Sequence, residues 1–140
     1  MPGEKLKVPF AGLIYGQIIY WGVMLGCLIV ILGSVIAFTT RHNFAPASYW
    51  ISAVWRGDSP AQIWQGITGA LPMGHWYFSH LTTGDGMSAF GISLGVFSVV
   101  PALFLSSAVL FKEGDRFYGL LALICGFIVL TGVLGLIPTG

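Results

Sequence analysis

One long uncharged run constrains this chain more than any other feature. No charged residue occurs between Val8 and Thr40, and positions 13–38 are dense in Ile, Leu, Val and Gly. Crossing the hydrocarbon core of a bilayer takes roughly 20 apolar residues, so this run is long enough. It also exceeds the roughly 7–15 apolar residues of a signal-peptide core, so we expect a retained span.

Two more apolar runs follow in the second half of the chain. The expected spans are 11–39, 87–111 and 117–137, and the last is closed by Pro138. Backbone polar groups in lipid must be satisfied within the segment, which favours helices. Only 8% of the residues are charged, against about 25% in a soluble domain. The sequence therefore predicts an all-α membrane protein, a single membrane domain over 1–140 with three transmembrane helices.

The basic residues predict an orientation. Loops on the cytoplasmic side carry an excess of Lys and Arg. Lys5 and Lys7 precede the first span, and Lys112 and Arg116 lie in the turn between the second and third spans. The long loop 41–86 contains only Arg41 and Arg56. We therefore expect a bacterial inner membrane protein with a cytoplasmic N-terminus, and with the loop and the C-terminus external.

Small residues recur at a spacing of four within the spans. This spacing lets helix backbones approach closely where lipid removes the hydrophobic drive for association. The expected packing positions are Gly12, Gly16, Gly22, Gly26, Gly91, Gly95 and Gly126. Pro101 should kink the second span, with the hydroxyls of Ser93, Ser98, Ser106 and Ser107 available to freed backbone groups. Three helices have more faces of small residues than they can bury against one another, which suggests that helices of partner subunits cover the rest.

The loop 41–86 is expected to contain short interfacial helices. Ser59 to Gln62 forms a capping-box pattern with Pro60 at the first helical position, which predicts a helix from Pro60 to about Gly69. A second helix is expected over 47–55, stopped by Gly57, and residues 83–85 should cap the second span. Trp and Tyr favour the headgroup level. The loop is thus either a lid on lipid or a docking surface for a periplasmic protein, with the candidate partner-binding residues Trp50, Trp55, Trp64, Trp76 and Tyr77.

Titratable side chains give few chemical leads. The histidines, His42, His75 and His80, all lie in the loop, and they are weak candidates for haem or quinone binding. Cys27 and Cys125 lie at different depths, so we expect no disulfide. The sequence has no Cys-x-x-Cys pattern, so we expect no metal site. No catalytic set is recognisable, so we expect a chain that is not an enzyme, and no cofactor is predicted. A net charge of +1 gives no support for nucleic-acid binding.

The last 55 or so residues resemble a family of small, uncharacterised bacterial inner-membrane proteins. The motifs are Gly84-Asp85-Gly86 before a helix, Gly91 and Gly95 within it, Pro101 at mid-helix, and Phe111 followed by Asp115-Arg116-Phe117-Tyr118 at a turn. The resemblance implies three spans, and it implies a genomic neighbourhood shared with sulfite-exporter-like permeases.

Three functions are compatible with these features. The first is a non-catalytic membrane subunit that anchors or scaffolds a larger inner-membrane complex of respiration or electron transfer. The second, suggested by the resemblance, is an accessory subunit of a small-anion transporter. The third is a haem- or quinone-binding membrane redox protein.

All three functions require hydrocarbon around the spans. We therefore predict that the expressed chain sediments with membranes and needs detergent or lipid to stay in solution. Ultracentrifugation followed by size-exclusion chromatography measures this. A chain that stays soluble and monodisperse in plain buffer would contradict the topology.

Overall fold

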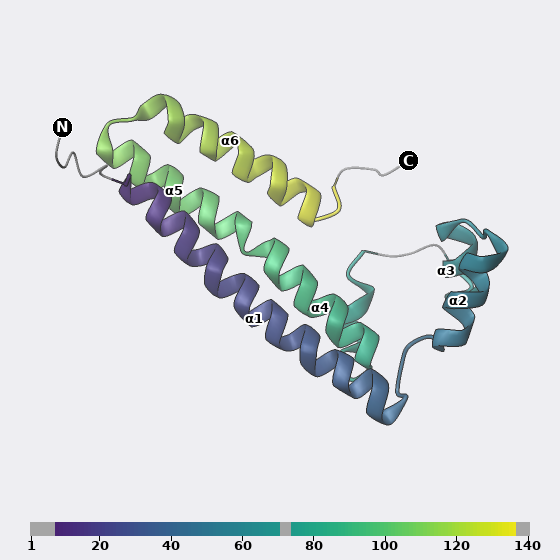
Figure 1. Cartoon of the computed structure of the whole chain (residues 1–140). Coiled ribbons are helices and arrows are strands. Elements are labelled where there is room, and N and C mark those ends of the chain that lie inside the picture. The colour runs from purple at the N-terminus through teal and green to yellow at the C-terminus, as the bar shows by residue number, and fades with distance from the viewer. Residues whose placement is uncertain (1–7, 71–73, 137–140) are drawn as a thin grey trace, which may run out of the picture. The chain divides into compact units, whose positions relative to one another are not determined.

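The computed structural model describes residues 8–70 and 74–136, and within these ranges the ordered elements are helices (Figure 1). The elements are α1 (Phe10–Thr40), α2 (Ala47–Arg56), α3 (Pro60–Thr68), the 3-10 helix η1 (Trp76–His80), α4 (Gly84–Phe97), α5 (Val99–Glu113) and α6 (Arg116–Val133). Lys5, Lys7 and the expected end of the third span at 137–138 lie outside the described residues.

Three helical segments are long and apolar enough to cross a membrane. They are Phe10–Thr40, Gly84–Glu113 and Arg116–Val133, and the middle one comprises α4 and α5 together. This result confirms the helical class and the number of candidate spans. The helix of the second candidate span begins at Gly84, three residues before the expected 87, and that of the third ends at Val133, four residues before the expected 137.

Local caps explain both boundaries. At the start of α4, the Thr83 hydroxyl accepts a hydrogen bond from the Gly86 N–H at 3.2 Å, which confirms the expected cap. At the end of α6, Gly135 takes a left-handed conformation with φ 67°. The Leu136 N–H then donates to the Thr131 carbonyl and the Gly135 N–H to the Gly132 carbonyl. This Schellman pattern stops the helix before 137.

Pro101 lies three residues after a break in the helical pattern. The regular helix is interrupted at Ser98, between α4 and α5. Pro101 has no N–H, so the carbonyl of Phe97 loses its usual donor. The serine hydroxyls were expected to compensate, but three of them donate elsewhere: Ser98 to Gly95, Ser106 to Ala11 and Ser107 to Gly119.

The chain divides into two compact units, and the first combines the start of α1 with the last two helices. Within it, α5 and α6 form a hairpin, with Gly114 turning at φ 93°. The Ser107 hydroxyl of α5 donates to the Gly119 carbonyl of α6 at 2.7 Å. The Ser106 hydroxyl donates to the Ala11 carbonyl of α1 at 3.1 Å. The beginning of α1 and the 112–116 turn therefore lie at the same end of this unit.

The second unit contains the rest of α1, the loop elements and α4. Here α1 and α4 approach through glycine. A Cβ added at Gly91 would lie 2.7 Å from the Gly26 carbonyl oxygen and 2.9 Å from a Val30 methyl carbon. A Cβ at Gly84 would lie 2.5 Å from the Cβ of Ala37. Only glycine permits these backbone separations.

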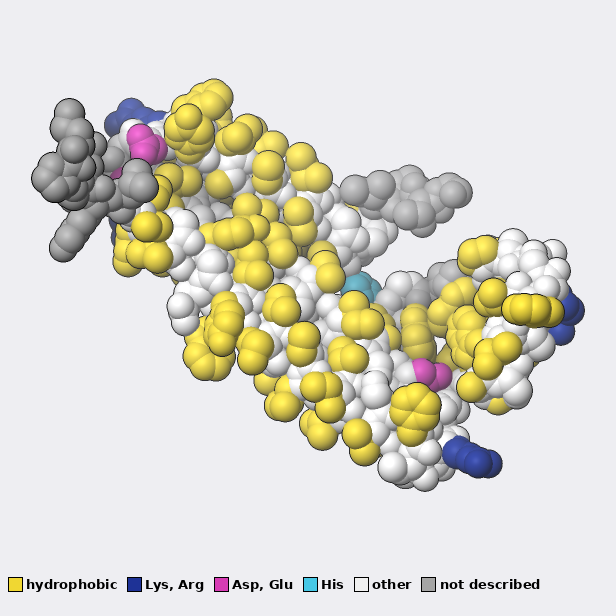
Figure 2. Space-filling view, viewed as in Figure 1, with side chains coloured by type: hydrophobic (Ala, Val, Ile, Leu, Met, Phe, Trp, Pro, Cys, Tyr) yellow, Lys and Arg dark blue, Asp and Glu magenta, His cyan; other side chains and the backbone are white. Residues whose placement is uncertain are grey.

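The buried interior consists mostly of small side chains. The largest fully buried one is Ser107, while large apolar side chains line the outside of all three candidate spans. Figure 2 shows hydrophobic side chains over much of the visible helix surface. Soluble monomeric proteins rarely expose so much contiguous apolar surface to water. The fold is therefore suited to an apolar surrounding.

The predicted glycines fall into two groups. Gly22 packs against Ser98, Gly26 and Gly91 meet each other, Gly95 lies near Val23, and Gly126 lies near Phe104. Gly12 and Gly16, by contrast, have no heavy atom of the described chain within 4 Å of an added Cβ. The first group lies at close contacts within the two units, whereas Gly12 and Gly16 leave an open face of α1. Cys27 and Cys125 are unpaired and exposed.

A substitution at the closest approach should weaken the fold. Gly91→Ala places a methyl group against the Gly26 carbonyl, so we expect a loss of about 1–3 kcal/mol in the free energy of unfolding. Unfolding in mixed detergent micelles, followed by far-UV circular dichroism, measures the change. The control is Gly132→Ala, where an added Cβ meets nothing within 4 Å. Equal stability of the two variants would contradict the packing described.

Candidate functional site

Two short helices form the main body of the loop between α1 and α4. The capping box of α3 is complete, because the Gln62 N–H donates to the Ser59 hydroxyl and the Ser59 N–H donates to Gln62 Oε1 at 2.8 Å. Gly57 and Gly69 end α2 and α3 in left-handed conformations. Both predicted loop helices are therefore confirmed, each within about two residues.

The two loop helices pack on one another. The Tyr49 hydroxyl of α2 donates to the Ile63 carbonyl of α3 at 3.0 Å, and Gly66 leaves room for that hydroxyl. Ala53 of α2 and Ile63 of α3 are buried. These contacts give the loop a defined structure of its own.

Aromatic side chains form a cluster beside this pair. The Phe44 ring centroid lies 5.0 Å from that of Trp76, and the Trp64 centroid lies 5.2 Å from that of Trp76. Trp50 meets Trp64 edge to face. The candidate partner-binding residues Trp50, Trp64 and Trp76 are therefore half-buried against one another. Tyr77 packs on the Phe90 ring of α4, with 6.3 Å between centroids.

Trp55 differs from the other loop tryptophans. Its side chain is 90% exposed, and it shares α2 with Ile51 and Val54, which are 68% and 67% exposed. Of the five residues predicted to bind a partner, Trp55 is thus the one that presents its whole ring outward. Sequence reasoning did not separate it from the others because the distinction depends on contacts between distant residues.

A single carboxylate fastens the loop to the start of α4. Asp85 accepts hydrogen bonds from the Phe44 N–H at 2.8 Å, the Ala45 N–H at 3.2 Å and the Gly86 N–H at 3.0 Å. The Gly84 N–H donates to the His42 carbonyl at 2.9 Å. From the sequence, Asp85 was expected to help cap α4. The hydrogen bonds from the Phe44 and Ala45 N–H groups to Asp85 join residues that are about 40 positions apart in the sequence.

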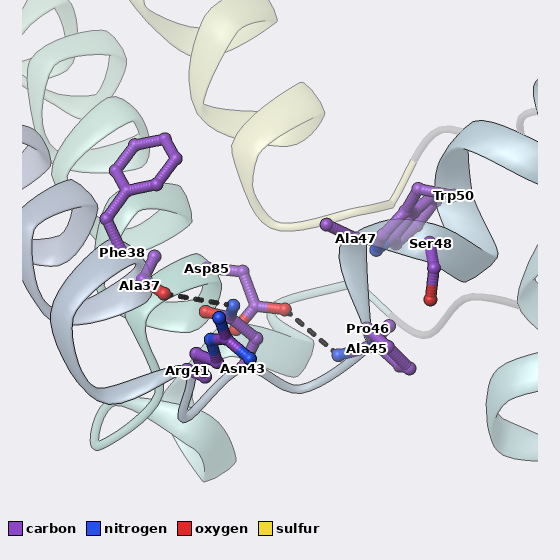
Figure 3. A pocket seen from close by; sticks show the side chains of 10 residues that line it. All are labelled: Ala37, Phe38, Arg41, Asn43, Ala45, Pro46, Ala47, Ser48, Trp50 and Asp85. Atoms are coloured by element: carbon purple, nitrogen blue, oxygen red, sulfur yellow. Dashed lines mark hydrogen bonds between the residues drawn. The ribbon is translucent and has the colours of Figure 1, made fainter.

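A pocket of about 700 Å³ lies beside this carboxylate. Figure 3 shows Phe38 and Ala37 of α1 on one side, Trp50 of α2 on the other, and the polar residues Arg41, Asn43 and Asp85 at its base. The Asn43 Nδ2 donates to the Ala37 carbonyl at 3.4 Å. Its Oδ1 is buried with no hydrogen-bond partner among the described residues. Such an acceptor is unfavourable unless something donates to it.

The three histidines are not brought together. Each Nδ1 lies near its own partner: Thr82 O for His42, the Tyr77 hydroxyl for His75 and Trp76 O for His80. Within residues 8–70 and 74–136, no group of three or more His, Cys, Asp or Glu side chains is placed to hold a metal ion. The His80 ring also meets the Phe44 ring edge to face, with 4.2 Å between centroids, so it forms part of the aromatic cluster.

Comparison with known proteins places the chain in a family. A protein-family model matches residues 11–136, and the chain belongs to that family. A protein of Archaeoglobus fulgidus, described as an uncharacterized protein, is 26% identical over 132 residues, which cover 87% of this chain and 86% of the relative. No solved structure matches. The family match includes all three candidate spans and the whole loop.

Removing the Asp85 charge should loosen the loop. In Asp85→Asn, an amide NH2 group replaces one carboxylate oxygen and faces backbone N–H donors. We therefore expect about tenfold faster hydrogen exchange at the amides of Phe44 and Ala45, which corresponds to a loss of ~1.4 kcal/mol in the free energy of opening. Hydrogen–deuterium exchange with mass spectrometry measures this.

The matched control is Asp58→Asn. Asp58 forms an ion pair with Arg56 at 2.9 Å, and both side chains are partly exposed. An exposed pair contributes about 0–1 kcal/mol, so exchange at Phe44 and Ala45 should not change. Unaltered exchange in Asp85→Asn as well would show that the carboxylate does not hold the loop.

Proposed function

We propose that this chain is a non-catalytic membrane-spanning subunit that anchors a larger membrane complex. The observation that carries the proposal is an open face near the start of α1. Gly12 and Gly16 meet no other part of the described chain, and Gln17 is exposed beside them. A face of this kind is suited to a helix from another chain.

The proposal first requires that the apolar helices lie in lipid. Large side chains such as Trp21, Leu28 and Phe127 are more than half exposed, which is the outward arrangement that hydrocarbon favours. We propose a location in the cytoplasmic membrane, with the beginning of α1 and the 112–116 turn on the cytoplasmic side. The turn contains Lys112 and Arg116, and loops on the cytoplasmic side are rich in Lys and Arg.

The open face of α1 has the chemistry of a helix–helix contact. At 100° per residue, Gly12, Leu13, Gly16, Gln17 and Tyr20 lie within an arc of about 140°. The residues of this arc are exposed. The glycines allow a second backbone to approach, and an exposed amide within a span gains a hydrogen bond from a neighbouring helix. Lipid alone would leave the Gln17 amide unsatisfied.

The loop supplies a second surface for assembly. Its helices are held by their own caps and by Asp85, so Ile51, Val54 and Trp55 are presented on an ordered helix. Ordered aromatic side chains lose little conformational entropy on binding, which is why they are enriched at protein interfaces. The anchoring role does not depend on which reaction the complex performs.

The test is assembly in native membranes. Extraction in mild detergent should yield the chain in a larger complex. Gly16→Leu should release it as a smaller species, because the side chain blocks backbone approach. Gln17→Leu should weaken association by about 1–2 kcal/mol, through loss of one interhelical hydrogen bond. Native gel electrophoresis with mass spectrometry of the bands measures both.

Gly132→Leu on α6 is the matched control, because an added Cβ there also meets nothing within 4 Å. It should leave the complex intact. A wild-type chain that is extracted alone as a stable monomer would refute the proposal. An equal loss of assembly in Gly132→Leu would refute the specific role of the α1 face.

A further inference from the structure

The pocket at the end of α1 has a mixed lining that suits an amphipathic ligand. Phe38, which is 85% exposed, and Trp50 supply apolar walls, whereas Arg41, Asn43 and Asp85 are polar (Figure 3). Its volume of about 700 Å³ falls within the range of small-molecule sites. Phe38 lies near the end of the uncharged run, and Trp favours the headgroup level, so the pocket is expected at the lipid–water boundary.

Two polar groups at this pocket lack partners. Among residues 8–70 and 74–136 the only ion pair is Arg56–Asp58, so the Arg41 guanidinium has no carboxylate partner there. The backbone of Arg41 is held in a left-handed conformation at φ 53°. The Asn43 Oδ1 accepts no hydrogen bond from the described residues, but it is fully buried, so a ligand in the pocket does not reach it. The site therefore offers the Arg41 guanidinium as a cation for a phosphate.

Asp85 adds a negative charge to the same lining. Its oxygens accept from three backbone N–H groups, which fix the carboxylate in place and leave its charge. A purely anionic headgroup would satisfy Arg41 but would be repelled by Asp85. A headgroup that carries both a phosphate and an ammonium group complements Arg41 and Asp85.

We propose that this pocket binds one phospholipid with an ethanolamine headgroup. The phosphate pairs with Arg41, the ammonium donates to the Asp85 carboxylate, and the acyl chains run past Phe38 and Trp50. Bound here, the lipid contacts both the end of α1 and the start of α2. This site is independent of the Gly12 and Gly16 face, so it does not rest on the proposed assembly.

The first experiment needs no variant. The full chain, purified in mild detergent, is titrated with phosphatidylethanolamine or with phosphatidylcholine of the same acyl chains, and bound lipid is counted by native mass spectrometry. Choline has no N–H donor for the Asp85 carboxylate, so we expect about tenfold stronger retention of phosphatidylethanolamine. Equal retention of the two lipids would overturn the proposal.

A pair of arginine variants tests the phosphate contact. Arg41→Asn removes the charge, and Asn tolerates the left-handed backbone, so the variant should fold. It should lower phosphatidylethanolamine binding about tenfold. Arg56→Asn, which changes a loop arginine outside the pocket, should leave binding unchanged. Equal effects of the two variants would count against the site.

A third arm separates a lipid from a soluble phosphate compound. Phosphoethanolamine without acyl chains should not displace the lipid at equal concentration, because the apolar walls then contribute nothing. Displacement at equal concentration would show a site for a soluble phosphoamine and would overturn the lipid assignment.

Discussion

The close approach of α1 and α4 is the constraint on which the second unit depends. The absence of side chains at Gly84 and Gly91 lets the two backbones meet, with Ala37 and Gly26 opposite them. This contact brings the end of α1 and the start of α4 together. Asp85 can then reach the N–H groups of Phe44 and Ala45, and the pocket forms beside it. The packing of α1 and α4 through small residues thus determines where Asp85 and the adjacent pocket lie.

Local signals made much of the architecture predictable. Uncharged runs gave the three helical spans, and the Ser59–Gln62 pattern, Gly57 and Thr83 gave helix boundaries, because each depends on residues within one or two turns. The end of α6 was also encoded locally, since Gly135 follows the last turn. The sequence predicted a later end because Leu136 and Ile137 extend the apolar run as far as Pro138.

Long-range contacts explain what the sequence did not reveal. Nothing near Asp85 indicates that its carboxylate binds amides about 40 residues earlier. The separation of Trp55 from Trp50, Trp64 and Trp76 likewise follows from ring contacts across the loop. The serine hydroxyls near Pro101 bind carbonyls of other turns and other helices, which depends on how the helices pair. Such outcomes require tertiary structure.

The hydrogen bonds to Asp85 have a consequence for sequence divergence. The donors are main-chain amides, which every residue except proline possesses, so the attachment of the loop does not depend on the side chains at positions 44 and 45. The α2–α3 pair is held by its own caps and by Tyr49. The outward residues of α2, including position 55, can therefore change while the attachment persists. Under the proposed assembly, a change of partner at this surface costs little in folding.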